Sequence, residues 1–168
     1  MNAIRWPDGF LPGQADNFVS NEVIVEGLST ERVWSLLVTP ERWPEYYANA
    51  SSPEVEGGNT LTEDRRFRFI TFGFHVEGRV VEYQSPTSTE PGRIAWHGWV
   101  EGSSDERLDV HHAWLVEPLL NNRLRILTQE TQQGLPAREL AAETPNPMLN
   151  AHQAWLDGLV SAAREAVS

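Results

Sequence analysis

The sequence predicts an α+β fold, in which a curved antiparallel sheet of about seven strands packs around a long C-terminal helix, with two short helices after the first strand. Between residues 50 and 133, short segments of alternating apolar and polar residues are separated by Gly, Pro, Asn or Asp, which is the pattern of antiparallel strands. From residue 147 onwards, apolar residues recur three and four positions apart, as on one face of a helix. A single helix laid on a twisted sheet covers part of one face, so a cavity is expected beside it.

The N-terminal segment, residues 1–17, is predicted to be an irregular arm, because prolines and glycines are interspersed there with a few apolar residues. The arm could cap the cavity or pack on a second subunit, so a homodimer is possible. Residues 18–168 are predicted to form a single domain, since no internal repeat, low-complexity stretch or linker divides them. Alternation over residues 18–26 predicts the first strand.

The two short helices follow this strand. Ser29 or Thr30 can cap the first, and Pro40 ends it and opens the second over residues 41–47. Six further strands are then predicted at residues 52–56, 66–74, 76–83, 93–101, 108–117 and 124–132.

Two details of this arrangement depend on single residues. In the strand at 76–83 the inward face is undecided, because the sets Val76, Gly78, Val80 and Arg79, Val81, Tyr83 fit equally well. In the C-terminal helix Asn146 is the expected N-cap, and Gly158 leaves room for close approach of another segment.

Composition excludes several classes of function. The net charge of -11 disfavours binding to nucleic acid or to anionic membranes. The absence of Cys removes disulfides, thiolate nucleophiles and cysteine-based zinc sites. The first residues lack an apolar signal core, and no apolar run approaches the about 18 residues of a membrane span. The expected location is therefore the cytoplasm.

Eight short segments, taken in order, resemble a known superfamily. They are Val33-Trp34-Ser35-Leu36-Leu37 with Pro40-Glu41-Arg42-Trp43-Pro44, Phe67-Arg68-Phe69 with Thr71-Phe72-Gly73, Arg93-Ile94-Ala95-Trp96, His112-Ala113-Trp114-Leu115, Thr128-Gln129-Glu130-Thr131-Gln132-Gln133-Gly134 and His152-Gln153-Ala154-Trp155-Leu156. The chain resembles the SRPBCC (START-like, helix-grip) superfamily, in particular the bacterial group labelled polyketide cyclase/dehydrase or Hsp90-ATPase-activator homologue. The resemblance implies a seven-stranded sheet gripping the C-terminal helix around an apolar cavity. It implies no shared activity, because members carry lipids, bind hormones or act on polyketides.

The histidines predict no metal site, and no cofactor is expected. His111 and His112 are adjacent on a strand and therefore point to opposite faces, while His75, His97 and His152 lie on other elements without ligand-like spacing. His112 shares its face with apolar residues. It either lines the cavity or, as is more common, is a core histidine bonded to a neighbour.

Glu130 is the other candidate for chemistry, because it shares a face with Leu124, Ile126 and Thr128. It is either a carboxyl group in an apolar wall, with a raised pKa, or a solvated group at the end of the sheet. His112 and Glu130 lie on sequential strands and form the only pair that we nominate for proton transfer.

Aromatic residues at strand and helix spacing give either a ligand wall or ordinary core packing. The ligand-binding candidates are Phe69, Trp96, Trp99, His112, Trp114, Glu130, His152 and Trp155.

These observations favour a binding protein for a small hydrophobic or aromatic molecule. One alternative is a polyketide cyclase/aromatase-like enzyme that uses Glu130 and His112 as acid and base. Another is a chaperone-associated interaction domain. An enzyme requires polar groups that converge in the cavity, a carrier requires an apolar cavity with an open mouth, and an interaction domain requires a filled interior with an exposed apolar patch.

Overall fold

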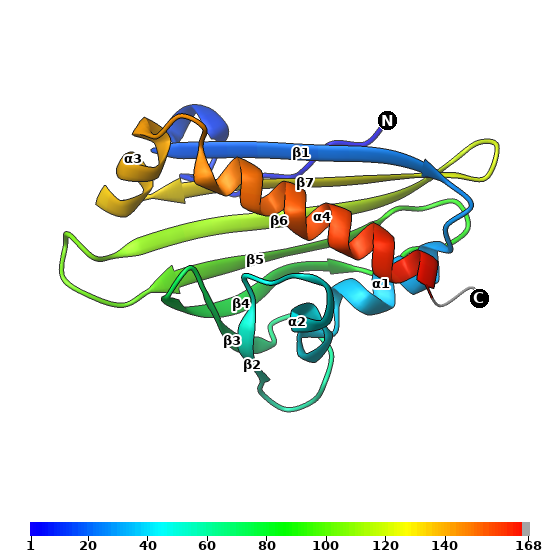
Figure 1. Cartoon of the computed structure of the whole chain (residues 1–168), viewed down its shortest axis with the longest axis horizontal. Helices are drawn as coiled ribbons and strands as arrows, with labels where there is room; N and C mark the ends of the chain where they lie inside the picture. Colours follow the sequence, from blue (N-terminus) through cyan, green and yellow to red (C-terminus); the bar gives the residue numbers. More distant parts are fainter. Residues whose placement is uncertain (166–168) are drawn as a thin grey trace.

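The computed structural model describes residues 1–165 and contains one seven-stranded antiparallel sheet, with strand order β1-β7-β6-β5-β4-β3-β2 (Figure 1). The strands are β1 (Asn17–Glu26), β2 (Ser51–Val55), β3 (Arg66–Thr71), β4 (Phe74–Gln84), β5 (Gly92–Val100), β6 (Leu108–Leu119) and β7 (Arg123–Gln133). The helices are α1 (Thr30–Leu37), α2 (Trp43–Tyr46), α3 (Leu135–Ala142) and α4 (Pro147–Glu165), with short 3-10 turns at Pro12–Gln14 and Pro40–Arg42.

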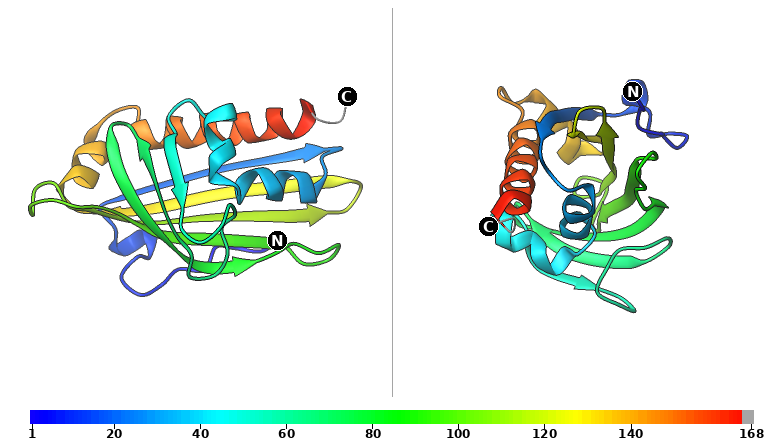
Figure 2. Two further views of the ribbon diagram at one scale, coloured as in Figure 1. Left: turned by 90° about the horizontal axis from the view of Figure 1, so that it is seen from below. Right: turned by 90° about the vertical axis from the view of Figure 1, so that its right-hand side faces the viewer.

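The sheet curves around α4, and α1 and α2 pack on the same side of it (Figure 2). Strands β2 to β7 follow one another as a meander, and β1 pairs with β7 to complete the sheet. The predicted α+β helix-grip architecture, including the two short helices after the first strand, is confirmed. Large aromatic side chains fill much of the interior, and those of Trp43, Trp96, Trp114, Trp155 and Phe67 are fully buried.

A bulge in β4 explains why its inward face was undecided. Val80 pairs with Trp96 while Glu82 pairs with Ala95, so one extra residue is inserted at Val81. Before the bulge Val80 packs in the core, and after it Tyr83 does. The set Val76, Gly78 and Val80 is therefore the inward one, and of the other set only Tyr83, beyond the bulge, contacts the core.

Two local predictions were wrong. The strand predicted over 66–74 ends at Thr71, because Phe72 and Gly73 both have positive φ (51° and 76°) and form a tight hairpin turn into β4. Helix α3 was not predicted at all. Of its eight residues, all described, only Ala137 is buried, so the apolar stripe that identifies an amphipathic helix is missing.

Both details predicted for α4 are confirmed. The Asn146 side chain caps the helix by accepting a hydrogen bond from the backbone N–H of Met148 at 3.0 Å. A Cβ atom on Gly158 would lie 1.9 Å from the carbonyl oxygen of Tyr46, so glycine is what allows α4 to cross α2 this closely.

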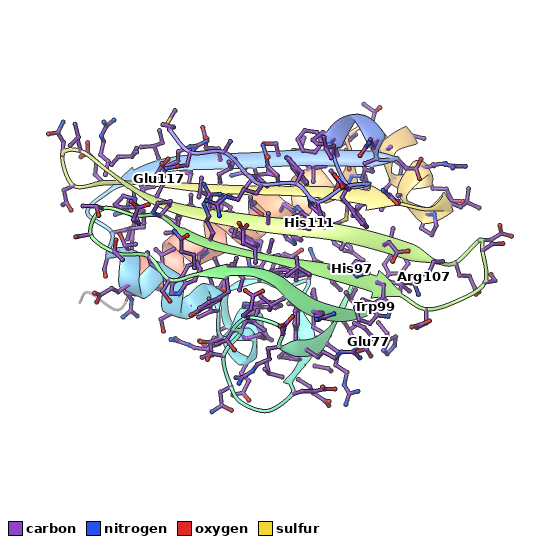
Figure 3. All side chains as sticks on the ribbon, turned by 180° about the vertical axis from the view of Figure 1, so that it is seen from behind. Glu77, His97, Trp99, Arg107, His111 and Glu117 are labelled. Carbon is purple, nitrogen blue, oxygen red and sulfur yellow. The ribbon has the colours of Figure 1, made fainter. Side chains whose placement is uncertain are left out.

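The N-terminal arm packs on the outer face of the sheet, away from α4 (Figure 3). Arg125 donates to the carbonyl of Asn2 at 2.8 Å, and the rings of Trp6 and Phe10 lie against His111. The arm therefore covers the chain's own sheet and does not cap the cavity. None of the helices in the described chain combines the length and apolar character needed to cross a membrane.

Candidate functional site

Three polar side chains meet on the concave side of the sheet: His112 from β6, Glu130 from β7 and His152 from α4. His112 and Glu130 are direct partners in the β6–β7 ladder, so their side chains stand side by side on one face. Each of the three residues is at most 5% exposed. We call this set the His-Glu-His cluster.

The cluster has a defined geometry. His112 Nδ1 lies 3.5 Å from Glu130 Oε1, and His152 Nε2 lies 3.6 Å from Glu130 Oε2. The two imidazole rings are stacked, with centroids 4.5 Å apart and planes inclined by 12°. Both rings therefore present a nitrogen to the same carboxyl group.

The hydrogen bonds of Thr128 fix the tautomer of His112. The Thr128 hydroxyl donates its single proton to the carbonyl of Ala113 at 3.1 Å, so it can only accept in its 2.8 Å contact with His112 Nε2. The proton of neutral His112 is therefore on Nε2. Nδ1, which faces Glu130, carries a lone pair.

A directed chain of amide side chains ends on Glu130. The backbone N–H of Met148 donates to Asn146 Oδ1, and Asn146 Nδ2 donates to Asn17 Oδ1 at 2.8 Å. Asn17 Nδ2 donates to Gln132 Oε1 at 2.8 Å, and Gln132 Nε2 donates to Glu130 Oε2 at 2.7 Å. Because the chain starts at a backbone donor, every amide orientation in it is determined. We call it the amide relay.

Burial shifts the pKa of each member of the cluster in the direction that favours the neutral side chain. Desolvation raises the pKa of Glu130 to about 8, against the lowering effect of the Gln132 hydrogen bond. Desolvation also lowers the pKa of His152 to about 4, and holds that of His112 well below its usual value, with a further contribution from the neighbouring His152. Of the two interpretations of Glu130, the carboxyl group in an apolar wall is therefore correct.

The cluster forms one end of a cavity between the sheet and α4. The cavity has a free volume of about 50 Å³, enough for about three to five water-sized groups. Apart from the cluster and Gln132, its wall is mainly apolar and includes Phe69, Val76, Trp96, Val110, Met148 and Trp155.

Beyond Phe74 and Val100 the cavity adjoins a groove on the surface. Five acidic residues line this groove: Glu77, Glu101, Asp105, Glu106 and Glu139. The groove that shares Phe74 and Val100 with the cavity wall is therefore rich in negative charge. We call this groove the acidic rim.

Most of the predicted ligand-binding residues border the cavity, namely Phe69, Trp96, His112, Glu130, His152 and Trp155. Trp114 does not line it but packs behind, with its ring centroid 5.6 Å from that of His112. Trp99 borders the cavity near its mouth, but its ring lies beside His97 and its indole N–H donates to the exposed Glu101 at 2.9 Å (Figure 3). Trp96 and Trp99 point to opposite faces of the strand, so Trp99 could contact a ligand only at the edge of the cavity.

Sequence reasoning missed Gln132 and Asn17, and it wrongly set His152 apart from the other polar candidates. Gln132 and Asn17 have a recognisable signal, since each is a polar residue in phase with the inward apolar set of its strand. For His152 the helical phase indicates that it faces the sheet, but its distance from β6 and β7 follows from how α4 crosses the sheet.

The comparisons with known proteins extend these observations. Neither a family model nor a curated protein matches the chain. Among solved structures, hypothetical protein jhp0584 from Helicobacter pylori is 51% identical, with 97% of each chain covered and a TM-score of 0.93.

More distant structures share the fold at low identity. Norcoclaurine synthase from Thalictrum flavum is 12% identical, with a TM-score of 0.57, over 85% of this chain and 90% of its own. The di-domain aromatase/cyclase StfQ of the steffimycin biosynthetic pathway is 12% identical, with a TM-score of 0.64, over 90% of this chain and 53% of its own. The 51% identity over nearly the whole of both chains places the chain in the same family as jhp0584, and its seven-stranded sheet with a gripped C-terminal helix is the fold that it shares with the more distant structures.

Proposed function

We propose that the protein binds a small, mainly apolar molecule in the cavity, with one polar group of that molecule directed at the His-Glu-His cluster. The observation that carries the proposal is an apolar cavity that ends on three buried ionisable groups. Burying such groups without strong hydrogen bonds among them is unfavourable for stability, so a ligand that contacts them is a physical reason for their presence.

The size of the cavity limits the part of the ligand that it encloses. A free volume of about 50 Å³ suits a short branched chain, and because benzene occupies a cavity of about 150 Å³, a single small ring requires the cavity to widen. The neighbouring tryptophan rings pack against one another, with Trp43 and Trp155 centroids only 5.0 Å apart, so they leave little space for a second ring. A larger molecule would have to project through the mouth at Phe74 and Val100.

The charge of the surroundings limits the ligand further. The acidic rim and the net charge of -11 repel anions and attract cations. We therefore expect a neutral or cationic ligand, such as a phenol or an aromatic amine, in preference to a carboxylate.

Tryptophan fluorescence and native mass spectrometry test the proposal. Phenol and benzylamine should quench the fluorescence of the protein and bind with 1:1 stoichiometry, whereas benzoate and two- or three-ring flavonoids should bind more weakly. Val110→Phe places a ring inside the cavity and should weaken binding at least about tenfold. Val81→Phe is the matched control, because Val81 is an exposed valine away from the cavity. Equal affinities in the two variants would contradict the proposal.

A second candidate function, acid–base catalysis on the bound molecule, is favoured by one observation. His112 and Glu130 face each other at 3.5 Å where both border the cavity. Catalysed proton transfer would make the protein exchange a carbon-bound proton of a suitable ligand for deuterium in D₂O. Glu130→Gln should abolish this exchange while the ligand still binds, and exchange that persists in the variant would exclude Glu130 from the role.

A further inference from the structure

The His-Glu-His cluster has the donor set and spacing of a metal site. One nitrogen of His112, one nitrogen of His152 and one carboxyl oxygen of Glu130 all lie within 4.8 Å of one another. Two donors that each lie about 2.1 Å from a tetrahedral zinc ion are roughly 3.4 Å apart. His112 Nδ1 lies 3.5 Å from Oε1 of Glu130 and His152 Nε2 lies 3.6 Å from Oε2, so each histidine nitrogen is close to that distance from one of the two carboxyl oxygens.

These separations are too long for good hydrogen bonds between the three groups. Nitrogen–oxygen hydrogen bonds are typically about 2.7 to 3.2 Å long. The proton of His112 is already used on Thr128, so the Nδ1 lone pair is directed at Glu130. The Nδ1 lone pair can accept the proton of a neutral Glu130, and a cation between the two groups stabilises it when Glu130 is ionised.

The surroundings of the donors also match those of a metal site. Thr128 holds His112 from its other nitrogen, and Gln132 holds Glu130, which is how neighbouring hydrogen bonds orient metal ligands. The amide relay extends this support from Gln132 to the capped end of α4. The open side of the cluster borders the cavity, so a further coordination position would face the space that a ligand enters.

We infer that His112, Glu130 and His152 bind a divalent transition-metal ion, with the cavity at its open coordination position. This inference rests on the proposed function for the ligand that would reach the open position. Two imidazoles and one carboxylate form the donor set of catalytic zinc sites and of non-haem iron(II) sites, whereas calcium and magnesium prefer oxygen donors alone. The acidic rim would raise the local concentration of cations at the entrance.

Zinc and cobalt(II) titrations of the metal-free protein test the inference. The whole chain is treated with a chelator, desalted, and titrated with ZnCl₂ by calorimetry, and Co²⁺ is added to a second sample for absorption spectroscopy. We expect one zinc ion per chain with a Kd in the micromolar range or below, and a visible cobalt spectrum of a tetrahedral or five-coordinate site. His152→Asn and Glu130→Gln should each weaken zinc binding by roughly 100-fold or more.

Two histidine variants serve as matched controls. His111→Asn changes the neighbouring buried histidine, which points to the other face of the sheet, and His97→Asn changes a partly exposed histidine beside Asp109. Both should retain the zinc affinity of the wild type, with circular dichroism verifying that all four variants are folded. Zinc binding that is lost in His97→Asn and kept in His152→Asn would place the ion at the surface and overturn the inference.

The same samples separate this inference from the proposed function. Phenol binding to the metal-free protein together with no 1:1 zinc binding would overturn the metal site and leave the ligand cavity standing. Zinc binding at the cluster without any binding of small aromatic compounds would retain the metal site and overturn the proposed ligand.

Discussion

At the scale of single residues, the interior of this protein combines a dense aromatic core with polar groups that the core does not satisfy. Within residues 1–165, the indole nitrogens of Trp114 and Trp155 and Nδ1 of His152 are buried without a hydrogen-bond partner. All three belong to side chains in or beside the His-Glu-His cluster. Four further atoms of this kind in the described residues lie on Asn21, Arg32, His111 and Thr131. Because unsatisfied buried polar groups destabilise a fold, the three beside the cavity are groups that a bound ligand could satisfy.

His111, on the opposite face of β6, provides a residue-scale prediction of pH dependence. Burial under the N-terminal arm lowers its pKa to about 4, against 6.5 for the free side chain. Between these two pH values the unfolded chain therefore binds more protons at this position than the folded chain does. The free energy of unfolding is therefore unaffected by protonation of His111 above pH 6.5, and it decreases as the pH falls from 6.5 toward 4.

The test compares the wild type with His111→Phe, which retains a ring between Trp6 and Phe10 but does not titrate. Urea unfolding at several pH values should show that the wild type loses about 3 kcal/mol relative to the variant between pH 6.5 and 4. All other titrating groups are common to the two proteins, so the difference reports position 111. Parallel stability curves would show that protonation of His111 is not linked to unfolding.

The residues of the cluster differ in how far the sequence could predict them. Strand alternation places His112 and Glu130 on inward faces, and the short connection between β6 and β7 brings them together. The inward position of His152 follows from helical phase, but its approach to Glu130 depends on how α4 crosses the sheet, which is a tertiary property. The local sequence pattern therefore predicts which face of its element a residue occupies. It does not predict contacts between distant elements.

At the scale of secondary-structure elements, the position of α4 is set by contacts at both of its ends. At its N-terminus Asn146 caps the helix and joins it through Asn17 to the first strand. Further along, α4 crosses α2 at Gly158, where its backbone lies against the carbonyl group of Tyr46. Because Met148, His152 and Trp155 all lie on this helix and border the cavity, the position of α4 also determines the shape of the site.

Gly158→Ala tests the crossing of α4 and α2. In an exposed helix this substitution stabilises by about 1 kcal/mol, because alanine is the better helix former. Here the added Cβ would lie 1.9 Å from the carbonyl oxygen of Tyr46, so the two elements must separate. We expect a net destabilisation of roughly 2 kcal/mol, measured by urea unfolding.

Gly13→Ala is the control for this experiment, because a Cβ atom there meets nothing within 4 Å. Its stability should remain within about 0.5 kcal/mol of the wild type. If Gly158→Ala were as stable as the control, close packing of α4 against α2 could not be the reason for a glycine at this position.

Among the elements, those with a strong period were predictable and those shaped by local backbone geometry were not. The helix α4 shows a helical phase over its length, and the long strands β6 and β7, buried on both faces over most of their length, are marked by the turn residues at their ends. The bulge at Val81 and the turn at Phe72 depend on one or two residues. Helix α3 follows β7 directly at Gly134, which has a φ of 122°. Only one residue of this helix is buried, so its sequence lacks the apolar periodicity that predicts a helix.

At the scale of the whole molecule, the sheet separates two surfaces with different composition. Its concave face holds α4, the cavity and the cluster, whereas its outer face carries the N-terminal arm and a set of ion pairs (Figure 3). On the outer face Arg125 bridges Glu22 and Glu117, at 2.6 Å and 3.1 Å. Asn2 adds hydrogen bonds to Glu117, so the arm is attached by both polar and aromatic contacts.

Removal of residues 1–15 tests whether the two faces act independently. Asp16 is retained in this truncation because it accepts a hydrogen bond from the backbone N–H of Gly134 at the start of α3. The truncated protein loses the contact of Arg93 with the carbonyl of Ala3 and the aromatic cover of His111. We expect a loss of about 3 kcal/mol in the free energy of unfolding, from the burial of two aromatic side chains and the hydrogen bonds of the arm.

Binding in the cavity should nevertheless be unchanged, because no residue of the arm is among those that line it. The affinities of the truncated protein for phenol and for zinc, measured at a temperature where it remains folded, should equal those of the full chain. The pH dependence assigned to His111 should shrink at the same time, since the ring is then exposed and its pKa returns toward 6.5. A folded truncation that loses cavity binding would show that the arm and the site are coupled through the sheet.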